Sequence, residues 1–141
     1  MSNFVAEKIV KKMIESNVKV NGSKVLVMGL TFKENVPDLR NSKVADLINR
    51  LEEYHVNVKV TDPIADPEEA VREHGVELQD IDNICGVDAV VVAVNHSQYN
   101  DIDLEEFKKF YKNGVDQPVF IDIKSMYDKV EAEKIYNYWR M

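Results

Sequence analysis

The chain has 141 residues, the length of one ordinary domain with a single hydrophobic core. Hydrophobic residues make up 45% of it and charged residues 30%, which is typical of a folded globular protein and excludes general disorder. The formal net charge of -7 argues against a nucleic-acid partner, because a phosphate backbone needs a basic face. A small nucleotide is not excluded, since one or two local cations can hold it.

Cysteine content and hydropathy bear on the compartment. The single cysteine, Cys85, cannot form a disulfide within the chain, so a reducing cytoplasm is the simplest location. No apolar run approaches the ~20 residues that span a bilayer. The first residues mix charges into their apolar positions, unlike a signal peptide. We therefore expect a cytoplasmic protein without membrane contact, in which Cys85 is a small core residue near a helix end.

The first half of the chain predicts a helix, a strand and a second helix. Apolar residues at helical spacing predict an amphipathic helix over residues 4–17. Asn21-Gly22 is a turn signal, and the apolar run over residues 24–30 is typical of a strand buried on both faces. After a polar loop, helical spacing returns over residues 44–51, with Ser42 as the expected N-cap.

The second half continues this alternation. The predicted strands cover residues 57–62, 88–94 and 118–122, and the predicted helices cover residues 68–73, 80–84, 104–111 and 132–139. Strands that alternate with helices imply right-handed βαβ units and a mainly parallel sheet with helices on both faces. The sequence therefore predicts a Rossmann-like, three-layer α/β fold preceded by an N-terminal amphipathic helix.

In sheets of this kind, ligands bind beyond the carboxyl ends of the strands. The loops expected there cover residues 31–41, 62–66, 95–100 and 123–127. They carry most of the polar residues that could form a site.

Lys33 and Arg40 lie in the first of these loops, next to the N-terminus of the predicted helix 44–51. Unpaired backbone N–H groups and the helix dipole attract anions there, and a lysine with an arginine fork could hold a diphosphate. The alternative is a solvated loop whose two cations pair with Glu34 and Asp38. Spacing alone does not separate the two readings.

The remaining polar residues have simpler interpretations. Lys124 could reach the same ligand as Lys33, although a surface lysine explains its position equally simply. A catalytic base at His96 would need a partner and a substrate proton, so we favour a histidine that caps or packs locally. The glycine-rich G-x-G-x-x-G fingerprint is missing after the first strand, where only Gly29 is present, so Asp62-Pro63 is interpreted as a strand stop. The scattered histidines and the lone cysteine give no metal-ligand spacing.

The sequence GLTFKENVPDLRNSKV at residues 29–44, followed by TDP at residues 61–63, resembles the C-terminal domain of the UDP-glucose/GDP-mannose dehydrogenase family. AVVVAVNHSQY and VFIDIKSMYD fit the same pattern in order, so the resemblance covers residues 25–127. It implies NAD-dependent oxidation of a sugar C6 alcohol to the uronic acid in two hydride transfers. In the family, NAD and the cysteine nucleophile belong to the N-terminal and central regions. No residue of this chain matches a catalytic one, so the chain alone is expected to be inactive.

The resemblance also implies roles for individual residues. Phe32 and Lys33 match a Phe-Lys pair that contacts the UDP-sugar, and Arg40 matches an arginine that reaches across the cleft to NAD. Lys124 stands where many members carry an arginine against the UDP diphosphate; lysine keeps the charge but loses the bidentate fork. The segment DIKSMYD at residues 122–128 is most similar to members that oxidise UDP-N-acetylhexosamines.

Two domain-level readings follow. In the preferred one, residues 1–20 are the end of the helix that connects the central and C-terminal domains, and residues 21–141 bind the UDP-sugar. Its partners would be the substrate, the remaining domains of the same enzyme, and a second copy in a homodimer or larger homo-oligomer. In the alternative, the chain is a non-catalytic Rossmann-like module for binding or oligomerisation, associating through an apolar stripe that helix 4–17 would leave exposed.

Overall fold

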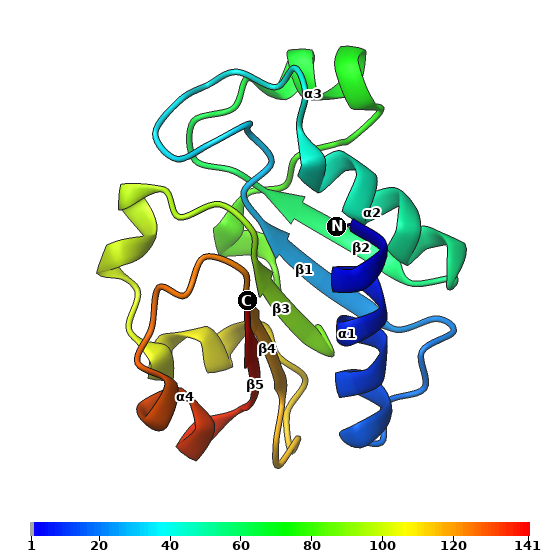
Figure 1. Cartoon of the computed structure of the whole chain (residues 1–141), viewed down its shortest axis with the longest axis vertical. Helices are drawn as coiled ribbons and strands as arrows, with labels where there is room; N and C mark the ends of the chain where they lie inside the picture. Colours follow the sequence, from blue (N-terminus) through cyan, green and yellow to red (C-terminus); the bar gives the residue numbers. More distant parts are fainter. Residues whose placement is uncertain (1) are drawn as a thin grey trace.

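The computed structural model describes residues 2–141, which form an α/β fold around a five-stranded parallel sheet. The strands are β1 (Lys24–Met28), β2 (Asn57–Thr61), β3 (Ala89–Val92), β4 (Val119–Asp122) and β5 (Asn137–Arg140), in the spatial order β2-β1-β3-β4-β5. Every neighbouring pair runs parallel, so all carboxyl ends meet at one edge of the sheet (Figure 1). The predicted fold class is confirmed.

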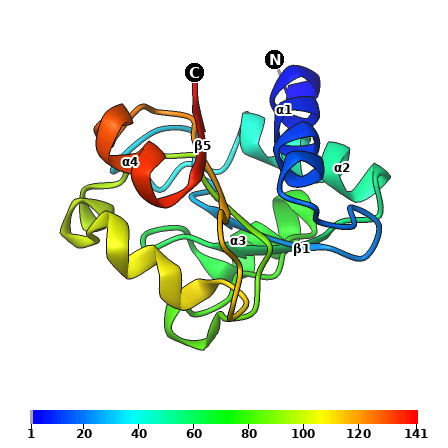
Figure 2. The same cartoon turned by 90° about the horizontal axis from the view of Figure 1, so that it is seen from below.

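Helices cover both faces of this sheet. They are α1 (Ser2–Glu15), α2 (Lys43–Glu53), α3 (Pro67–His74) and α4 (Lys129–Ile135), with short 3₁₀ helices η1 (Ile81–Asn83), η2 (Ser97–Asp101) and η3 (Leu104–Phe110). Successive strand residues point to opposite faces. Val25 and Val27 therefore pack with α1 and α2, whereas Leu26 and Met28 pack with η3 and α4. Figure 2 shows α1 and α2 on one side of the sheet and α4 on the other.

The helix predicted over residues 132–139 is wrong in its second half. Helix α4 ends at Ile135, and residues 137–140 form β5, which pairs with β4. Tyr136 and Tyr138 are buried while Asn137 and Trp139 are only partly so, a period of two that fits a strand. Tyrosine and tryptophan also favour strands. Because β5 pairs with β4 alone, it forms an edge of the sheet.

The expectation that helix 4–17 leaves an apolar stripe exposed is wrong for the centre of the stripe. Val5, Ile9 and Met13 are buried in the core under α1. Helix α1 packs against α2 and β4, so the domain itself covers this part. Phe4 and Ile14, the outer apolar residues of the stripe, are exposed. Among residues 2–141, no helix is long and apolar enough to cross a membrane.

Gly29 is the point at which the chain leaves β1 for the carboxyl edge. Its φ is 101°, and a Cβ atom placed on it would lie 2.6 Å from the Cβ of Val94. A side chain is therefore excluded both by conformation and by the close passage of the chain after β3. This crossing brings the loops after β1 and β3 together at the site.

Candidate functional site

The loop between β1 and α2, residues 29–42, projects beyond the carboxyl edge of the sheet (light blue to cyan in Figure 1). Its return to α2 is fixed by Ser42, whose hydroxyl donates to the carbonyl of Leu30 at 2.6 Å and accepts from the N–H of Ala45. The predicted N-cap is confirmed. Leu39 is buried in the core, and its carbonyl lies 2.6 Å from Nε2 of His74. Both arms of the loop are thus fastened to the fold.

The three residues of this loop singled out from the sequence are all exposed: Phe32, Lys33 and Arg40. Phe32 is 52% exposed although it is large and apolar, and its N–H donates to the carbonyl of Asp38. Nε of Arg40 lies 3.1 Å from Oδ1 of Asp38, and this hydrogen bond lowers the pKa of that carboxyl. Arg40 therefore pairs with Asp38, as expected for the alternative of a solvated loop. Its side chain is 74% exposed, so leaving this surface pair costs little.

A cavity of about 120 Å³ opens between this loop and the ends of β3 and β4. It is lined by Ser2, Val5, Thr31, Phe32, Lys43, Val44, Leu47, Ala93, Val94, Ile123 and Lys124. Phe32 and Lys124, predicted from separate loops, therefore share one cavity. Lys33 and Arg40 lie outside the lining, on the exposed part of the same loop. Such a cavity, largely apolar with cations at its edge, suits an aromatic ring attached to an anionic group.

Lys43 is a lining residue that the sequence analysis missed. It is the first residue of α2, directly after the N-cap, where unpaired backbone N–H groups and the helix dipole favour an anion. The sequence predicted Ser42 as the N-cap and apolar helical spacing from Val44, but no role was given to the lysine between them. The available signal was its place directly after the expected N-cap, where a helix N-terminus favours an anion.

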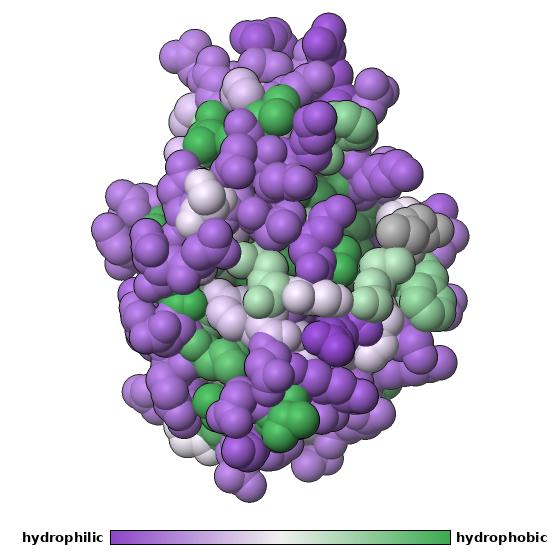
Figure 3. All heavy atoms as spheres, turned by 60° about the vertical axis from the view of Figure 1, so that its left-hand side comes forward, coloured by the Kyte–Doolittle hydropathy of each residue, from purple (hydrophilic) through white to green (hydrophobic). Residues whose placement is uncertain are grey.

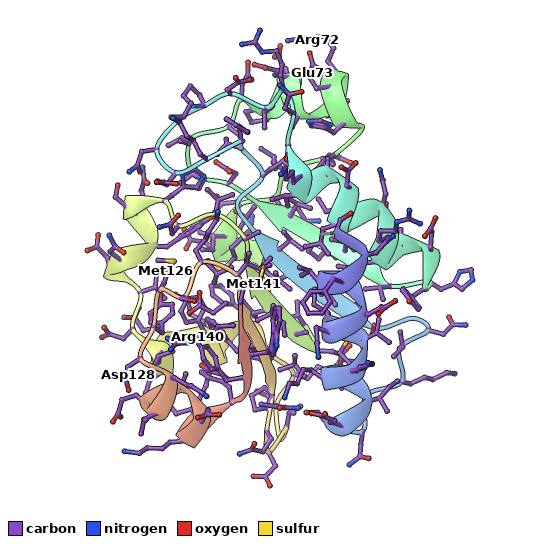
Figure 4. All side chains as sticks on the ribbon, viewed as in Figure 1. Arg72, Glu73, Met126, Asp128, Arg140 and Met141 are labelled. Carbon is purple, nitrogen blue, oxygen red and sulfur yellow. The ribbon has the colours of Figure 1, made fainter. Side chains whose placement is uncertain are left out.

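Lys124 lies in a tight turn that follows β4. Ser125 has a φ of 54°, and its hydroxyl donates to the carbonyl of Met141 at 3.0 Å. Figure 4 shows Met126 and Asp128 on this segment, with Arg140 of β5 and the following Met141 nearby. The turn that carries Lys124 is thus bound to the end of the chain.

Beneath the first loop, Asp62 and His96 form a buried pair. Both side chains are fully buried, and Nε2 of His96 lies 3.0 Å from Oδ2 of Asp62. Burial by itself would raise the pKa of Asp62, but the bond from His96 and backbone N–H bonds from Leu30, Ile64 and Ala65 lower it to about 2. Strand β2 does end at Thr61, as the strand-stop reading of Asp62 requires.

His96 is a packed histidine, as favoured from the sequence, but its partners are not local. Besides Asp62, they are Thr31 and Asn35, more than 60 residues away in the sequence. With no substrate-accessible atom on a fully buried side chain, the structure favours a structural role over catalysis. The sequence did not predict this network, because its members lie far apart along the chain.

Two other sequence-based interpretations concern metals and the cysteine. Within residues 2–141, no group of three or more histidine, cysteine, aspartate or glutamate side chains could hold a metal ion. Cys85 is exposed, so its assignment to the core is wrong. Its neighbour Ile84 is buried instead, and Gly86, with a φ of 70°, turns the chain immediately afterwards.

The surface around the loops is polar. Figure 3 shows mainly hydrophilic residues over the upper part of the molecule, with apolar atoms more frequent toward the middle and lower parts. In Figure 4, Arg72 and Glu73 of α3 mark the far upper end of the fold, away from the turn that carries Lys124.

Known proteins with similar sequences point to one family. UDP-N-acetyl-D-glucosamine 6-dehydrogenase of Pseudomonas aeruginosa is 36% identical over 133 residues, which are 94% of this chain and 31% of that protein. The protein of the same name from Salmonella typhi is 39% identical over 124 residues, 88% of this chain and 28% of that one. The chain therefore spans about a third of the length of these relatives.

Solved structures agree on the fold. NDP-N-acetyl-D-galactosaminuronic acid dehydrogenase from Methanosarcina mazei Go1 superposes with a TM-score of 0.79 at 24% identity, over 98% of this chain and 29% of that one. A UDP-glucose dehydrogenase from Pyrobaculum islandicum gives a TM-score of 0.65 at 28% identity, over 94% of this chain and 29% of that one. Residues 26–129 match the UDP binding domain of the UDP-glucose/GDP-mannose dehydrogenase family. Because this match covers well over half of the chain, the chain belongs to that family and corresponds to its UDP-binding domain.

Proposed function

We propose that this chain is the C-terminal, nucleotide-sugar-binding part of an NAD-dependent UDP-sugar 6-dehydrogenase. The observation that carries the proposal is the shared cavity of Phe32, Lys43 and Lys124 at the carboxyl edge of the sheet. The ring of Phe32 offers a face for a base or sugar, while the two lysines and the N-terminus of α2 offer positive charge to a diphosphate.

Lys33 extends this site from the adjacent exposed loop. Its neighbour Phe32 lines the cavity, so a diphosphate bound there lies within reach of a flexible lysine on the same loop. The substrate class is a UDP-sugar, and the similarity to UDP-N-acetyl-D-glucosamine 6-dehydrogenases favours an N-acetylhexosamine as its sugar.

NAD accepts the hydride in this family. In this chain we expect it to contact only the edge of the domain, because the main part of its binding site lies elsewhere in the enzyme. After β1 the loop has Gly29 but lacks the other glycines that let a backbone approach a dinucleotide pyrophosphate. Arg40 is exposed and held by a single surface pair, so it is the residue of this chain that would turn toward a cofactor bound elsewhere. We assign residues 1–20 to the connecting helix and expect the rest of the enzyme to supply catalysis and to assemble as a homo-oligomer.

The test is a calorimetric titration of the purified chain with UDP. Wild type should bind weakly, and Lys33→Ala and Lys124→Ala should each weaken binding by several-fold, since a charged hydrogen bond contributes ~1.5–3 kcal/mol before solvent screening. Lys108→Ala is the matched control, because Lys108 is an exposed lysine on η3 that pairs with Glu105. Equal binding by wild type and Lys33→Ala would remove Lys33 from the site.

A second measurement addresses the enzyme. The chain alone should not reduce NAD in the presence of any UDP-sugar, because no residue in it is assigned to bond-breaking chemistry. Turnover by the purified chain would contradict the proposal that catalysis lies in other domains.

A further inference from the structure

His96 carries its ring proton in a defined place. Nδ1 accepts the backbone N–H of Asn35 at 3.0 Å, so this nitrogen is unprotonated. The ring proton therefore sits on Nε2, which lies 3.0 Å from Oδ2 of Asp62 and 3.1 Å from Oγ1 of Thr31. The Thr31 hydroxyl donates in turn to the carbonyl of Lys33. One neutral histidine thus connects the ends of β2 and β3 to the loop after β1.

Asp62 fixes the start of the same loop. An ionised carboxylate only accepts hydrogen bonds, and here Oδ2 accepts from the N–H groups of Leu30 at 2.7 Å and Thr31 at 3.3 Å. Oδ1 accepts from Ile64 and Ala65, both at 2.9 Å. The carboxylate therefore ties the turn after β2 to the first residues of the loop.

Asn35 fixes the other end of the segment. Its φ is 61°, and its side-chain Oδ1 accepts from both the N–H and the hydroxyl of Ser97, at 2.9 and 3.0 Å. Asn35 is thus held twice, by His96 through its N–H and by Ser97 through its side chain. Between Thr31 and Asn35 lie three residues, all exposed: Phe32, Lys33 and Glu34. Phe32 and Lys33, the two proposed contacts of the nucleotide, therefore lie on a short arch, residues 31–35, that is held at both ends.

We propose that Asp62 and His96 are positioning residues of the nucleotide site, which hold the arch of residues 31–35 in the shape that presents Phe32 and Lys33 to UDP. This inference rests on the proposed function. Neither residue touches the ligand, because both side chains are fully buried. Without the clamp the arch samples other shapes, and the apparent affinity falls in proportion to the fraction of molecules in the binding shape.

The test uses variants of His96 that remove its hydrogen-bond donor, its acceptor or both. The readouts are UDP affinity and amide exchange. His96→Asn keeps an acceptor near the position of Nδ1, and His96→Gln keeps a donor near the position of Nε2. His96→Ala keeps neither. We expect His96→Ala to bind UDP about tenfold more weakly, which corresponds to a tenth of the molecules in the binding shape. The amide of Asn35 should then exchange faster. His96→Asn should restore protection of the Asn35 amide at least in part, which a general loss of stability would not allow.

Lys33→Ala is the matched control, since it should lose affinity while the Asn35 amide keeps its wild-type exchange rate. If His96→Ala does not fold, His96→Gln decides, because it loses the acceptor for the Asn35 N–H and keeps a donor near the position of Nε2. A threefold or greater loss of affinity in this variant, with faster exchange of the Asn35 amide, supports the clamp. A folded His96→Ala or His96→Gln that binds UDP as wild type does overturns the positioning role alone. Absence of UDP binding by wild type overturns the proposed function as well.

Discussion

The hydroxyl of Tyr138 on β5 donates a 2.6 Å hydrogen bond to Oδ2 of Asp122 at the end of β4. Burial, together with the neighbouring Asp122, raises the pKa of Tyr138 well above its ordinary value, so this hydroxyl stays a donor at any working pH. The same carboxylate accepts the N–H groups of Met126 and Tyr127 at 2.9 and 3.0 Å. Asp122 therefore closes the turn that carries Lys124 and binds it to the last strand.

Tyr138→Phe should loosen this turn without disturbing the sheet. The variant keeps the ring, which lies 5.9 Å from that of Phe120, and removes one hydrogen bond to a buried carboxylate. We expect a loss of ~1–3 kcal/mol in the free energy of unfolding and a several-fold loss of UDP affinity. Urea denaturation and calorimetry measure the two effects. Tyr136→Phe is the control, because the Tyr136 hydroxyl binds the carbonyl of Leu104, away from the turn. Tyr136→Phe should lose stability but keep UDP affinity. If wild type, Tyr138→Phe and Tyr136→Phe all bind UDP equally, β5 does not support the nucleotide site.

Gly29→Ala should destabilise the fold more than an ordinary glycine substitution. Any side chain at this φ is strained by ~1–2 kcal/mol, and the new Cβ would also meet the Cβ and N atoms of Val94 at 2.6 and 2.9 Å. Overpacking of this kind adds ~1–3 kcal/mol. Gly22→Ala is the matched control, since Gly22 has a φ of 85° and open space around it. In urea denaturation, Gly29→Ala should lose clearly more stability than Gly22→Ala, and equal losses would show that the crossing at Val94 adapts freely.

The buried strands could be predicted because each is a short continuous apolar run, as in residues 88–94. Strand β5 could not, since Tyr136 to Trp139 allow either a helix or an edge strand, and only pairing with β4 decides. The loops of the site could be placed from topology, because parallel strands bring their carboxyl ends together. The clamp could not be predicted, since the bonds that Asp62 and His96 make to the loop after β1 join residues 31 to 65 positions apart.

The family resemblance leads us to expect an arginine in many members at the position of Lys124, and this expectation allows a gain-of-affinity test. A guanidinium can bind a diphosphate with two parallel hydrogen bonds, whereas the ammonium group of lysine acts as a point charge. Lys124 is exposed at the edge of the cavity, so a longer side chain has room to adjust. We expect Lys124→Arg to bind UDP up to several-fold more tightly and Lys124→Ala to bind it more weakly, in calorimetric titrations at one fixed ionic strength. Uridine, which has no phosphate, is the control ligand and should not distinguish the three proteins. If all three bind UDP equally, Lys124 does not contact the diphosphate.

The lowered pKa of Asp62 predicts a specific acid sensitivity. The native pKa of about 2 lies below the ordinary value of 3.8, so Asp62 stabilises the fold above about pH 4, and this contribution disappears as the pH falls toward 2. The shift corresponds to about 2 kcal/mol at neutral pH. Asp62→Asn should therefore be much less stable than wild type at pH 7, and the gap in the free energy of unfolding should narrow below pH 4. Urea denaturation at a series of pH values measures this gap. Asp116→Asn, at an exposed loop position, is the control and should follow the wild-type profile. A constant gap between wild type and Asp62→Asn from pH 7 to pH 3 would mean that the charge on Asp62 does not stabilise the fold.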